Sequence, residues 1–190
     1  MRRHPEPRTL ALDELAIAHP RHRIRVRAWR REDIDDLARN ADHPEVARFL
    51  RDRFPSPYTR QDAIAFVETV AAASPREFRA IDIDGAAAGG IGIHPGSDVH
   101  RRSGELGYWL APVHWRAGIM TAVVNGYVPA MMDALGLVRV SAMAYEPNVA
   151  SQRLLERCGF AFEGRQRRAI VKNGVIMDAL VYARVREDDR

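Results

Sequence analysis

The sequence predicts a single α/β domain built on a mixed sheet that carries helices on both faces. Two patterns lead to this prediction. Strand-like segments with alternating side chains are interrupted by segments in which apolar residues recur at helical spacing. One strand hairpin opens the core and another closes it, so the strands cannot all be parallel. With 190 residues, 46% of them hydrophobic, the chain suffices for one sizeable core and is too short for two ordinary domains.

The first segment, residues 1–22, carries three prolines and no sustained periodicity. We therefore expect an N-terminal extension with at most a short helical turn at residues 10–16, followed by the domain over residues 23–186. Nine arginines and three acidic residues lie within residues 1–31, so this end is basic while the remainder is slightly acidic. Such an arm can contact RNA or an acidic partner, but a solvated edge is the simpler interpretation, and nucleic acid is not an expected partner.

The next part of the chain begins with a strand and continues with helices. Residues 24–29 alternate apolar and basic side chains, as a half-exposed strand does. Residues 31–50 predict one or two helices, broken near His43 and Pro44.

A capping signal predicts the start of a further helix. Thr59 is followed three residues later by Asp62, which is the spacing of a capping box. Apolar residues then recur on one face of the predicted helix, namely Ile64, Phe66, Val67 and Val70.

A strand hairpin follows. Residues 78–83 and 87–94 read as two strands, and Asp84 with Gly85 between them is a good signal for a tight turn. Residues 95–103 predict a polar loop.

The centre of the chain predicts a strand at residues 105–110 and a helix that starts at Gly118. Pro129 lies inside the helical pattern, where it removes one hydrogen bond and clashes with the preceding turn, so we expect a break or kink there. A helix start offers unpaired backbone amides and the positive end of the helix dipole, to which Arg116 adds a full charge. A diphosphate would fit at this junction, although many similar junctions bind nothing.

The last part predicts a strand at residues 138–144, then a helix at residues 148–158 that Gly159 stops. Two closing strands, at residues 161–168 and 175–185, are joined by a turn near Asn173 and Gly174.

Targeting, redox and metal signals are sparse. The longest apolar runs fall far short of a membrane span, and the first residues lack the apolar core of a signal peptide. We therefore expect a cytoplasmic protein that does not associate with a membrane. Cys158 is the only cysteine, which excludes an internal disulfide, and we assign it to the core. No spaced set of histidines and acids suggests a metal site, so no metal is expected.

Residues 146–160, directly after a predicted strand, carry the most specific pattern, in which N-x-x-S-x-x-L-L-E-x-x-G-F begins at Asn148. This pattern resembles the GNAT superfamily of acetyl-CoA dependent N-acetyltransferases. Three further segments are similar to its Rim-type branch, which acetylates the N-termini of ribosomal proteins: residues 55–67, 104–124 and 172–185. The resemblance implies a single GNAT-like domain with a mixed, mostly antiparallel sheet, helices on both faces and a splayed pair of central strands.

The resemblance also implies the cofactor site. The superfamily's pyrophosphate loop, Q/R-x-x-G-x-G/A, corresponds to residues 115–120, where Trp115 replaces a polar residue and Met120 replaces a small one and would crowd the phosphates. A family bulge in the preceding strand would direct backbone amides at the pantetheine and thioester. The residues expected to bind acetyl-CoA are Leu110, Ala111, Arg116, Ala117, Gly118, Ile119, Met120, Thr121, Asn148 and Arg153. Asn148 also suits a helix cap, and Arg153 also suits a solvated helix face.

Two catalytic residues follow from the same resemblance. Glu105, early on the central strand, corresponds to the glutamate that this branch is thought to use as a base through water; the alternative is an ordinary strand-end acid. Many relatives place a tyrosine acid in the later helix, but that position is Leu155 here, so Ser151 is the expected proton donor or orienting group. The alternative is a first-turn serine without a catalytic role.

We therefore expect acetyl-CoA dependent transfer to a primary amine, with a peptide or protein N-terminus, such as that of a ribosomal protein, as the leading acceptor. At neutral pH, an α-amine with a pKa of about 7.7 to 8.0 costs less free energy to deprotonate than a lysine amine with a pKa near 10.4, so it needs a weaker base. Small amines, including antibiotics and polyamines, stay open, because nothing in residues 30–60, which should wall the acceptor cleft, decides the matter. The alternative from another class is a non-catalytic module that binds acyl-CoA or RNA, which the missing tyrosine favours. Whether the chain forms a homodimer also stays open.

Overall fold

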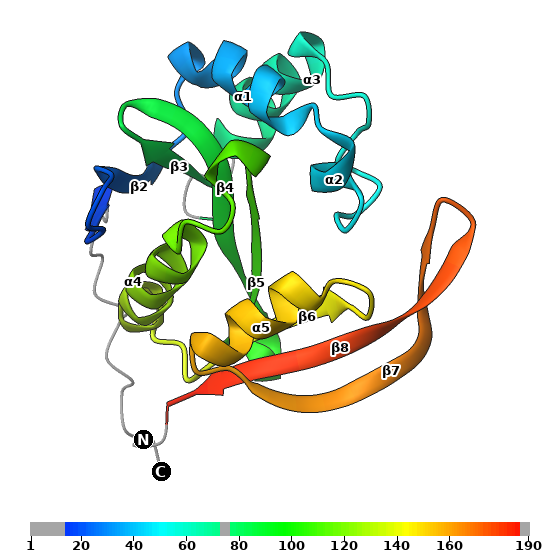
Figure 1. The fold of residues 1–190 in the computed structure, drawn as a ribbon. Coiled ribbons are helices and arrows are strands. Elements are labelled where there is room, and N and C mark those ends of the chain that lie inside the picture. The colour runs from blue at the N-terminus through cyan, green and yellow to red at the C-terminus, as the bar shows by residue number, and fades with distance from the viewer. Residues whose placement is uncertain (1–13, 73–76, 187–190) are drawn as a thin grey trace.

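The computed structural model describes residues 14–72 and 77–186. Their centre is one eight-stranded sheet in the order β1-β2-β3-β4-β5-β6-β8-β7 (Figure 1). The strands are β1 (Glu14–Ile17), β2 (Ile24–Ala28), β3 (Arg79–Ile83), β4 (Ala86–Pro95), β5 (Ser103–Leu110), β6 (Arg139–Tyr145), β7 (Ala161–Lys172) and β8 (Val175–Val185). Every neighbouring pair is antiparallel except β5 and β6. The predicted mixed, mostly antiparallel sheet is thus confirmed.

The first described residues differ from the sequence prediction. Glu14–Ile17 form the edge strand β1, which pairs with β2, and Ile17 is buried in the core. The helical turn expected at residues 10–16 is therefore wrong for residues 14–16, because pairing with β2 and burial of Ile17 outweigh a weak local helical preference. Residues 1–13 lie outside the described part, and the domain boundary at residue 23 stays a prediction.

One face of the sheet is covered by the helices that follow β2. They are the short 3-10 helix η1 (Arg31–Asp33), α1 (Ile34–Ala41), α2 (Pro44–Ala47), α3 (Arg60–Ala65) and the π-helical continuation η2 (Phe66–Ala71). The predicted break at His43 and Pro44 is confirmed, since His43 caps α2 and Pro44 is its first residue. The predicted capping box is confirmed as well, because Thr59 accepts from the Asp62 amide and Asp62 accepts from the Thr59 amide.

A buried ion cluster ties these helices to the sheet. Arg27 on β2 donates to both carboxylate oxygens of Asp33, at 2.7 and 2.8 Å, and to Asp82 on β3 at 2.9 Å. All three side chains are almost completely buried. Burial raises the pKa of Asp82, but hydrogen bonds from Arg27 and from the Gly85 amide, with the charges of Arg27 and Arg25, outweigh it and lower the pKa.

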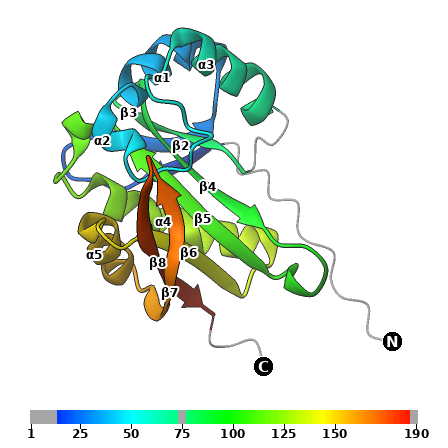
Figure 2. The same ribbon diagram turned by 90° about the vertical axis from the view of Figure 1, so that its right-hand side faces the viewer.

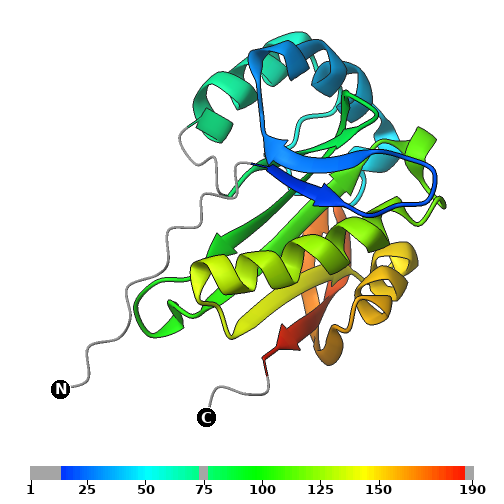
Figure 3. The same cartoon turned by 90° about the vertical axis from the view of Figure 1, so that its left-hand side faces the viewer.

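The opposite face carries α4 (Ile119–Leu135) and α5 (Val149–Arg157), so the prediction of helices on both faces is confirmed. Most of the buried apolar side chains of the sheet meet α4 in the main core. Figure 3 shows α4 as one uninterrupted helix lying along the sheet. It continues through Pro129, so the predicted break is wrong; Asn125, whose carbonyl loses its partner, is exposed to solvent. A smaller kink there stays a prediction.

Both predicted hairpin turns are confirmed. Asp84 and Gly85 join β3 to β4, and Asn173 and Gly174 join β7 to β8, all four with positive φ as a type I′ hairpin turn requires. The polar loop before β5 contains the short helix η3 (Asp98–His100), and η4 (Pro112–His114) links β5 to the turn before α4. Within residues 14–72 and 77–186, no helix is long and apolar enough to cross a membrane.

The β7–β8 hairpin reaches across the molecule toward the helical half (Figures 1 and 2). Near its tip, Lys172 donates to Asp52, in the segment between α2 and α3, at 2.8 Å. This lysine, the only one in the chain, is almost fully buried. The tip of the β7–β8 hairpin is therefore connected to the segment between α2 and α3.

Candidate active site

The site begins where the central strands separate. β5 and β6 pair only over Ser103–Leu106 and Arg139–Ala142, although β5 continues to Leu110 and β6 to Tyr145. Beyond Leu106 the two strands diverge, so the expected splayed pair is present. The gap exposes backbone and side chains of both strands near the middle of the sheet.

A cleft of about 740 Å³ fills this gap. It extends from the divergent ends of β5 and β6 to the first turns of α4 and α5. Its lining includes ten of the expected site residues: Glu105, Leu110, Arg116, Gly118, Ile119, Met120, Thr121, Asn148, Ser151 and Arg153. Ala111 and Ala117 are not among the residues that line it.

The start of α4 has the features of an anion-binding site. Gly118 precedes the helix with φ +78°, no side chain caps the first amides, and the first turn contains no acid. Arg116 also has positive φ, so the chain turns sharply before the helix. Such turns gather backbone N–H groups around one point, where the helix dipole adds positive potential. Met120 lines the cleft, although most of its side chain is buried in the core, so the expected crowding of the phosphates stays a prediction.

Three arginines add full charges to the cleft. Arg116 precedes α4, while Arg153 and Arg157 lie one turn apart on α5, and all three line the cleft. Within residues 14–72 and 77–186, the side chains of these three arginines form no hydrogen bond or ion pair. Unpaired guanidinium groups beside uncapped helix amides suit a multiply charged phosphate ligand.

The backbone of β5 offers a second kind of donor. Its register with β4 is regular from Gly104 to Leu110, and the Ala111 amide continues it by donating to Ala88 at 2.8 Å. The expected bulge is therefore absent and the Ala111 amide is already used, which corrects the expectation for that residue. Since alternate amides of a strand point to opposite sides, the Leu110 N–H points toward the diverged β6 and into the cleft.

The start of α5 joins Ser151 to a residue that the sequence did not single out. Asn148 caps α5 by accepting from the Ser151 amide at 3.2 Å. The Ser151 hydroxyl lies 2.7 Å from the phenolic oxygen of Tyr108 on β5. Burial raises the pKa of Tyr108, which the hydrogen bond to Ser151 opposes in part, so Tyr108 keeps its proton at neutral pH. Leu155, the position of the tyrosine in many relatives, is buried in the core.

Glu105 lies on the opposite face of β5 from Tyr108. Its carboxylate, partly exposed, forms an ion pair with Arg51, which lies in the segment after α2. Glu105 lines the cleft and also a second cavity of about 640 Å³ between the sheet and the α1–α3 layer. The two cavities share Leu50, Arg51, Glu105, Gly107, Tyr108 and Trp109.

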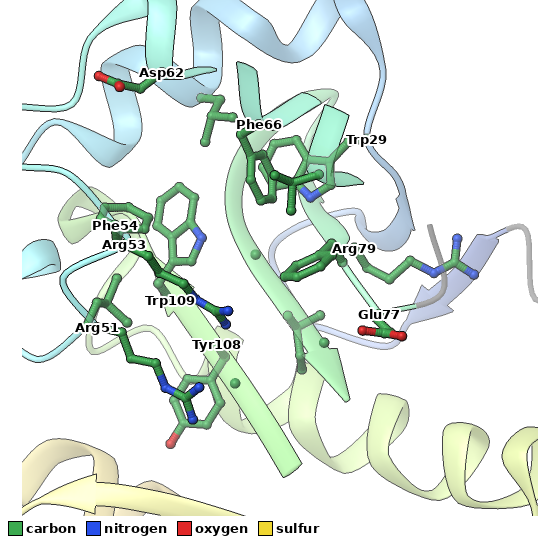
Figure 4. A pocket seen from close by; sticks show the side chains of 18 of the residues that line it. Trp29, Arg51, Arg53, Phe54, Asp62, Phe66, Glu77, Arg79, Tyr108 and Trp109 are labelled. Carbon is green, nitrogen blue, oxygen red and sulfur yellow. The ribbon is translucent and has the colours of Figure 1, made fainter. Parts of the chain in front are cut away.

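Figure 4 shows the second cavity, with Arg51 and Tyr108 near one end and Trp29 and Phe66 on the opposite side. Residues 30–60 contribute Leu37, Leu50, Arg53, Phe54 and Tyr58 to its lining, and its use as the acceptor cleft stays a prediction. The acids of this region that could favour a polyamine are largely engaged: Asp35 pairs with Arg60, Asp36 with Arg39 and Glu45 with Arg48.

Sequence reasoning missed Tyr108, Arg51 and Arg157. A signal existed for two of them. Tyr108 lies three positions after Glu105, so strand alternation places it on the other face of the same strand. Arg157 lies four positions after Arg153, which puts both on one face of the helix. For Arg51, in an irregular segment far from Glu105 in sequence, no local pattern exists.

The fold and site define a class of protein. Residues 23–161 match the family model described as acetyltransferase (GNAT) domain, so the chain belongs to the GNAT acetyltransferase family. The family resemblance seen in the sequence is confirmed.

Particular relatives agree with this. YoaA of Bacillus subtilis (strain 168), named an uncharacterized N-acetyltransferase, is 41% identical over 98 residues, which cover 52% of this chain and 55% of YoaA. YdaF of the same strain, provisionally named a ribosomal N-acetyltransferase, is 32% identical over 105 residues, 55% of this chain and 57% of YdaF. The chain thus spans about half the length of these curated relatives. RimJ of Mycobacterium smegmatis, solved in complex with CoA-disulfide, shares the fold, with a TM-score of 0.80 and 23% identity over 92% of this chain and 88% of RimJ.

Proposed function

We propose that this protein is an acetyl-CoA dependent N-acetyltransferase that acetylates a primary amine, with peptide or protein N-termini as the leading acceptors. One observation carries the proposal. A cleft with an uncapped helix start and three arginines meets a second cavity on β5, at Glu105, Gly107 and Tyr108. Two substrates bound in these cavities would meet at that junction, which is what direct transfer in a ternary complex requires.

The residues of the cleft fit acetyl-CoA. Its diphosphate would be held by the amides of residues 118–121 and by Arg116, with Arg153 and Arg157 available for an outer phosphate. Asn148 and the Leu110 amide would orient the pantetheine arm. When bound, acetyl-CoA supplies an activated acetyl thioester; the protein supplies position and proton transfer.

Glu105 is the proposed base. An acceptor amine arrives largely as an ammonium ion and must lose a proton before it can attack. Glu105, at the junction of the cavities, would accept that proton, directly or through water. Arg51 must move aside or share the carboxylate when the acceptor binds, because the two side chains are paired.

Tyr108 and Ser151 together form the proposed acid. The leaving sulfur needs a proton, and the phenol hydroxyl beside Ser151 is a protonated donor in the wall of the cleft. Ser151 would orient the phenol and accept from it in the resting state. This pair supplies the proton donor that the leucine at position 155 cannot provide, so the argument for a non-catalytic module loses its main support.

An acceptor screen tests the function. Purified protein with acetyl-CoA is offered peptides and small amines, and thiol release is recorded. We expect turnover with at least one amine, whereas release with none of them would contradict the proposal. Small-molecule amines remain a second candidate class, favoured by the volume of the second cavity, about 640 Å³, within the size range of small-ligand sites.

A pair of glycine variants tests the junction itself. A Cβ at Gly107 would meet nothing within 4 Å, and the backbone there has no positive φ, so Gly107→Val should fold normally. Its side chain would enter the passage between the cavities, and turnover should fall at least about tenfold. Gly164→Val on β7 is the matched control, since it too meets nothing within 4 Å and lies away from both cavities. Equal rates for both variants would show that transfer does not occur at this junction.

A further inference from the structure

The second cavity is more aromatic than an amine alone requires. Seven aromatic side chains line it: Trp29, Phe54, Tyr58, Phe66, Phe78, Tyr108 and Trp109. Six of them are only partly buried, all but Tyr58, so their rings keep apolar surface turned to the open space. Partly exposed aromatic surface around a concave site is typical of ligand pockets rather than of a closed core.

The rings form two walls. Trp29 packs edge-on against Phe66 with ring centres 5.5 Å apart, and Phe66 packs edge-on against Phe78 at 5.7 Å. On the other side, Phe54 contacts Trp109 at 5.7 Å. Figure 4 shows Phe54 and Trp109 on one side of the cavity and Trp29 and Phe66 on the other. Each wall is fixed by its own ring contacts, so the space between them has a defined width.

The floor of the cavity is kept free by glycines of β4. A Cβ at Gly90 would lie 2.6 Å from the indole nitrogen of Trp109, and one at Gly92 would lie 1.8 Å from the carbonyl oxygen of Glu77. The absence of a side chain at Gly90 and Gly92 therefore leaves room for the Trp109 indole and the Glu77 backbone at these positions. A larger residue at either position would displace a wall.

Three carboxylates line the cavity, those of Asp62, Glu77 and Glu105, and Arg53 and Arg79 also line it. Glu105 pairs with Arg51 at the junction with the cleft, and Glu77 pairs with His94 at 3.1 Å. Asp62 is held by Thr59. Each of these three carboxylates already accepts a hydrogen bond, so a second ammonium group would have to compete with an existing partner there.

We propose that this cavity selects an acceptor whose α-amine is attached to a carbon bearing an aromatic side chain. The inference rests on the proposed transferase function and adds the substrate class. The amine would lie at Glu105, and the ring would lie between the walls of Trp29 and Phe66 on one side and Phe54 and Trp109 on the other. This chemistry occurs both at a polypeptide N-terminus and in a free amino acid.

The activity test compares a phenylalanyl peptide with an alanyl peptide of otherwise identical sequence, beside free phenylalanine. Since even one methylene in an apolar pocket changes kcat/KM by about 10- to 200-fold, we expect a preference of at least about 50-fold for the phenylalanyl peptide. Phe66→Ala should reduce that preference at least about tenfold. Phe162→Ala, the control, removes a half-exposed ring that lies outside both cavities and should leave the preference unchanged. Turnover of free phenylalanine above that of the peptide would identify the amino acid as the acceptor, and the reverse would identify a polypeptide N-terminus.

A binding test separates this inference from the proposed function. Trp29 and Trp109 line the cavity, so phenylalaninamide should cause a saturable change in tryptophan emission without acetyl-CoA, whereas alaninamide at the same concentrations should not. Phe66→Ala should raise the dissociation constant for phenylalaninamide at least about tenfold, whether or not the protein shows transferase activity. Equal kcat/KM for the two peptides with the transferase active would overturn the inference and leave the function intact. No turnover with any amine would remove the function, and the emission titration would then decide the inference alone.

Discussion

The anion site at the start of α4 makes a prediction that needs no acceptor. If CoA binds there, it stabilises the native state and raises the melting temperature. Free CoA at 100 times its dissociation constant should add about 2.7 kcal/mol to the free energy of unfolding. For a chain of this length, that corresponds to a rise of roughly 5 to 11 °C.

Gly118→Asp should remove this stabilisation. A Cβ at Gly118 meets nothing within 4 Å, so the added side chain does not clash with the protein. Its carboxylate would instead face the diphosphate, and two like charges 4 to 6 Å apart repel by roughly 3 to 4 kcal/mol at an effective dielectric constant near 20. A hundredfold loss of affinity, the lower end of that range, leaves about 0.4 kcal/mol of stabilisation at the same CoA concentration, or about 1 °C.

Two matched variants isolate the charge and the place. Gly118→Asn tolerates the left-handed backbone and carries no charge, so it should keep most of the shift. Gly136→Asp puts the same residue at the other end of α4, where φ is +63° and a Cβ again meets nothing within 4 Å, and should keep the full shift. The assay is a thermal melt of all four proteins with and without CoA. Loss of the shift in Gly136→Asp, or its retention in Gly118→Asp, would refute the argument.

Three further predictions follow from the same geometry. Glu105→Gln should lower kcat/KM most at low pH, where free amine is scarce, and kcat/KM should recover as the pH rises. Ser151→Ala should instead lower kcat/KM roughly tenfold to a hundredfold at every pH. Parallel pH profiles for the two variants would indicate that both residues have structural roles only. Asn148→Ala should cost about 1 kcal/mol of unfolding free energy and also weaken CoA binding, while Thr59→Ala, which removes a cap far from the cleft, should cost a similar stability and leave CoA affinity unchanged. Asp82→Asn breaks a buried ion pair and should cost about 3 to 5 kcal/mol at pH 7. Because the pKa of Asp82 is lowered by folding, its contribution is present above the unfolded pKa and lost as the pH falls through the folded one, so urea unfolding should show the variant and wild type converging in acid.

The sequence predicted the elements of the fold well and the contacts of the site poorly, for physical reasons. Hairpin turns at Asp84 and Asn173 depend on local backbone preferences that the residues themselves carry. Strand β1 did not show in the pattern, because its four residues are stabilised by pairing with β2 rather than by their own periodicity. In the site, the turn at Arg116 before α4 and the cap of α5 are local features, so the sequence predicts them. The pairing of Arg51 with Glu105 joins positions 54 residues apart, so only the folded chain brings it about.

Strand geometry explains how one short stretch of β5 could serve both of the proposed proton transfers. Side chains alternate along a strand, so Glu105 faces the α1–α3 layer and Tyr108 faces α4 and α5. In a closed sheet the two groups would be separated by a continuous layer of hydrogen-bonded backbone. Here β6 leaves β5 after Leu106, so both groups border the same opening, and Gly107 between them puts no side chain into it. The proposed base would therefore approach an acceptor from one face and the proposed acid would approach a leaving sulfur from the other, with the reacting atoms in the gap. On this argument a side chain large enough to close the gap should abolish transfer while leaving the two substrates able to bind separately.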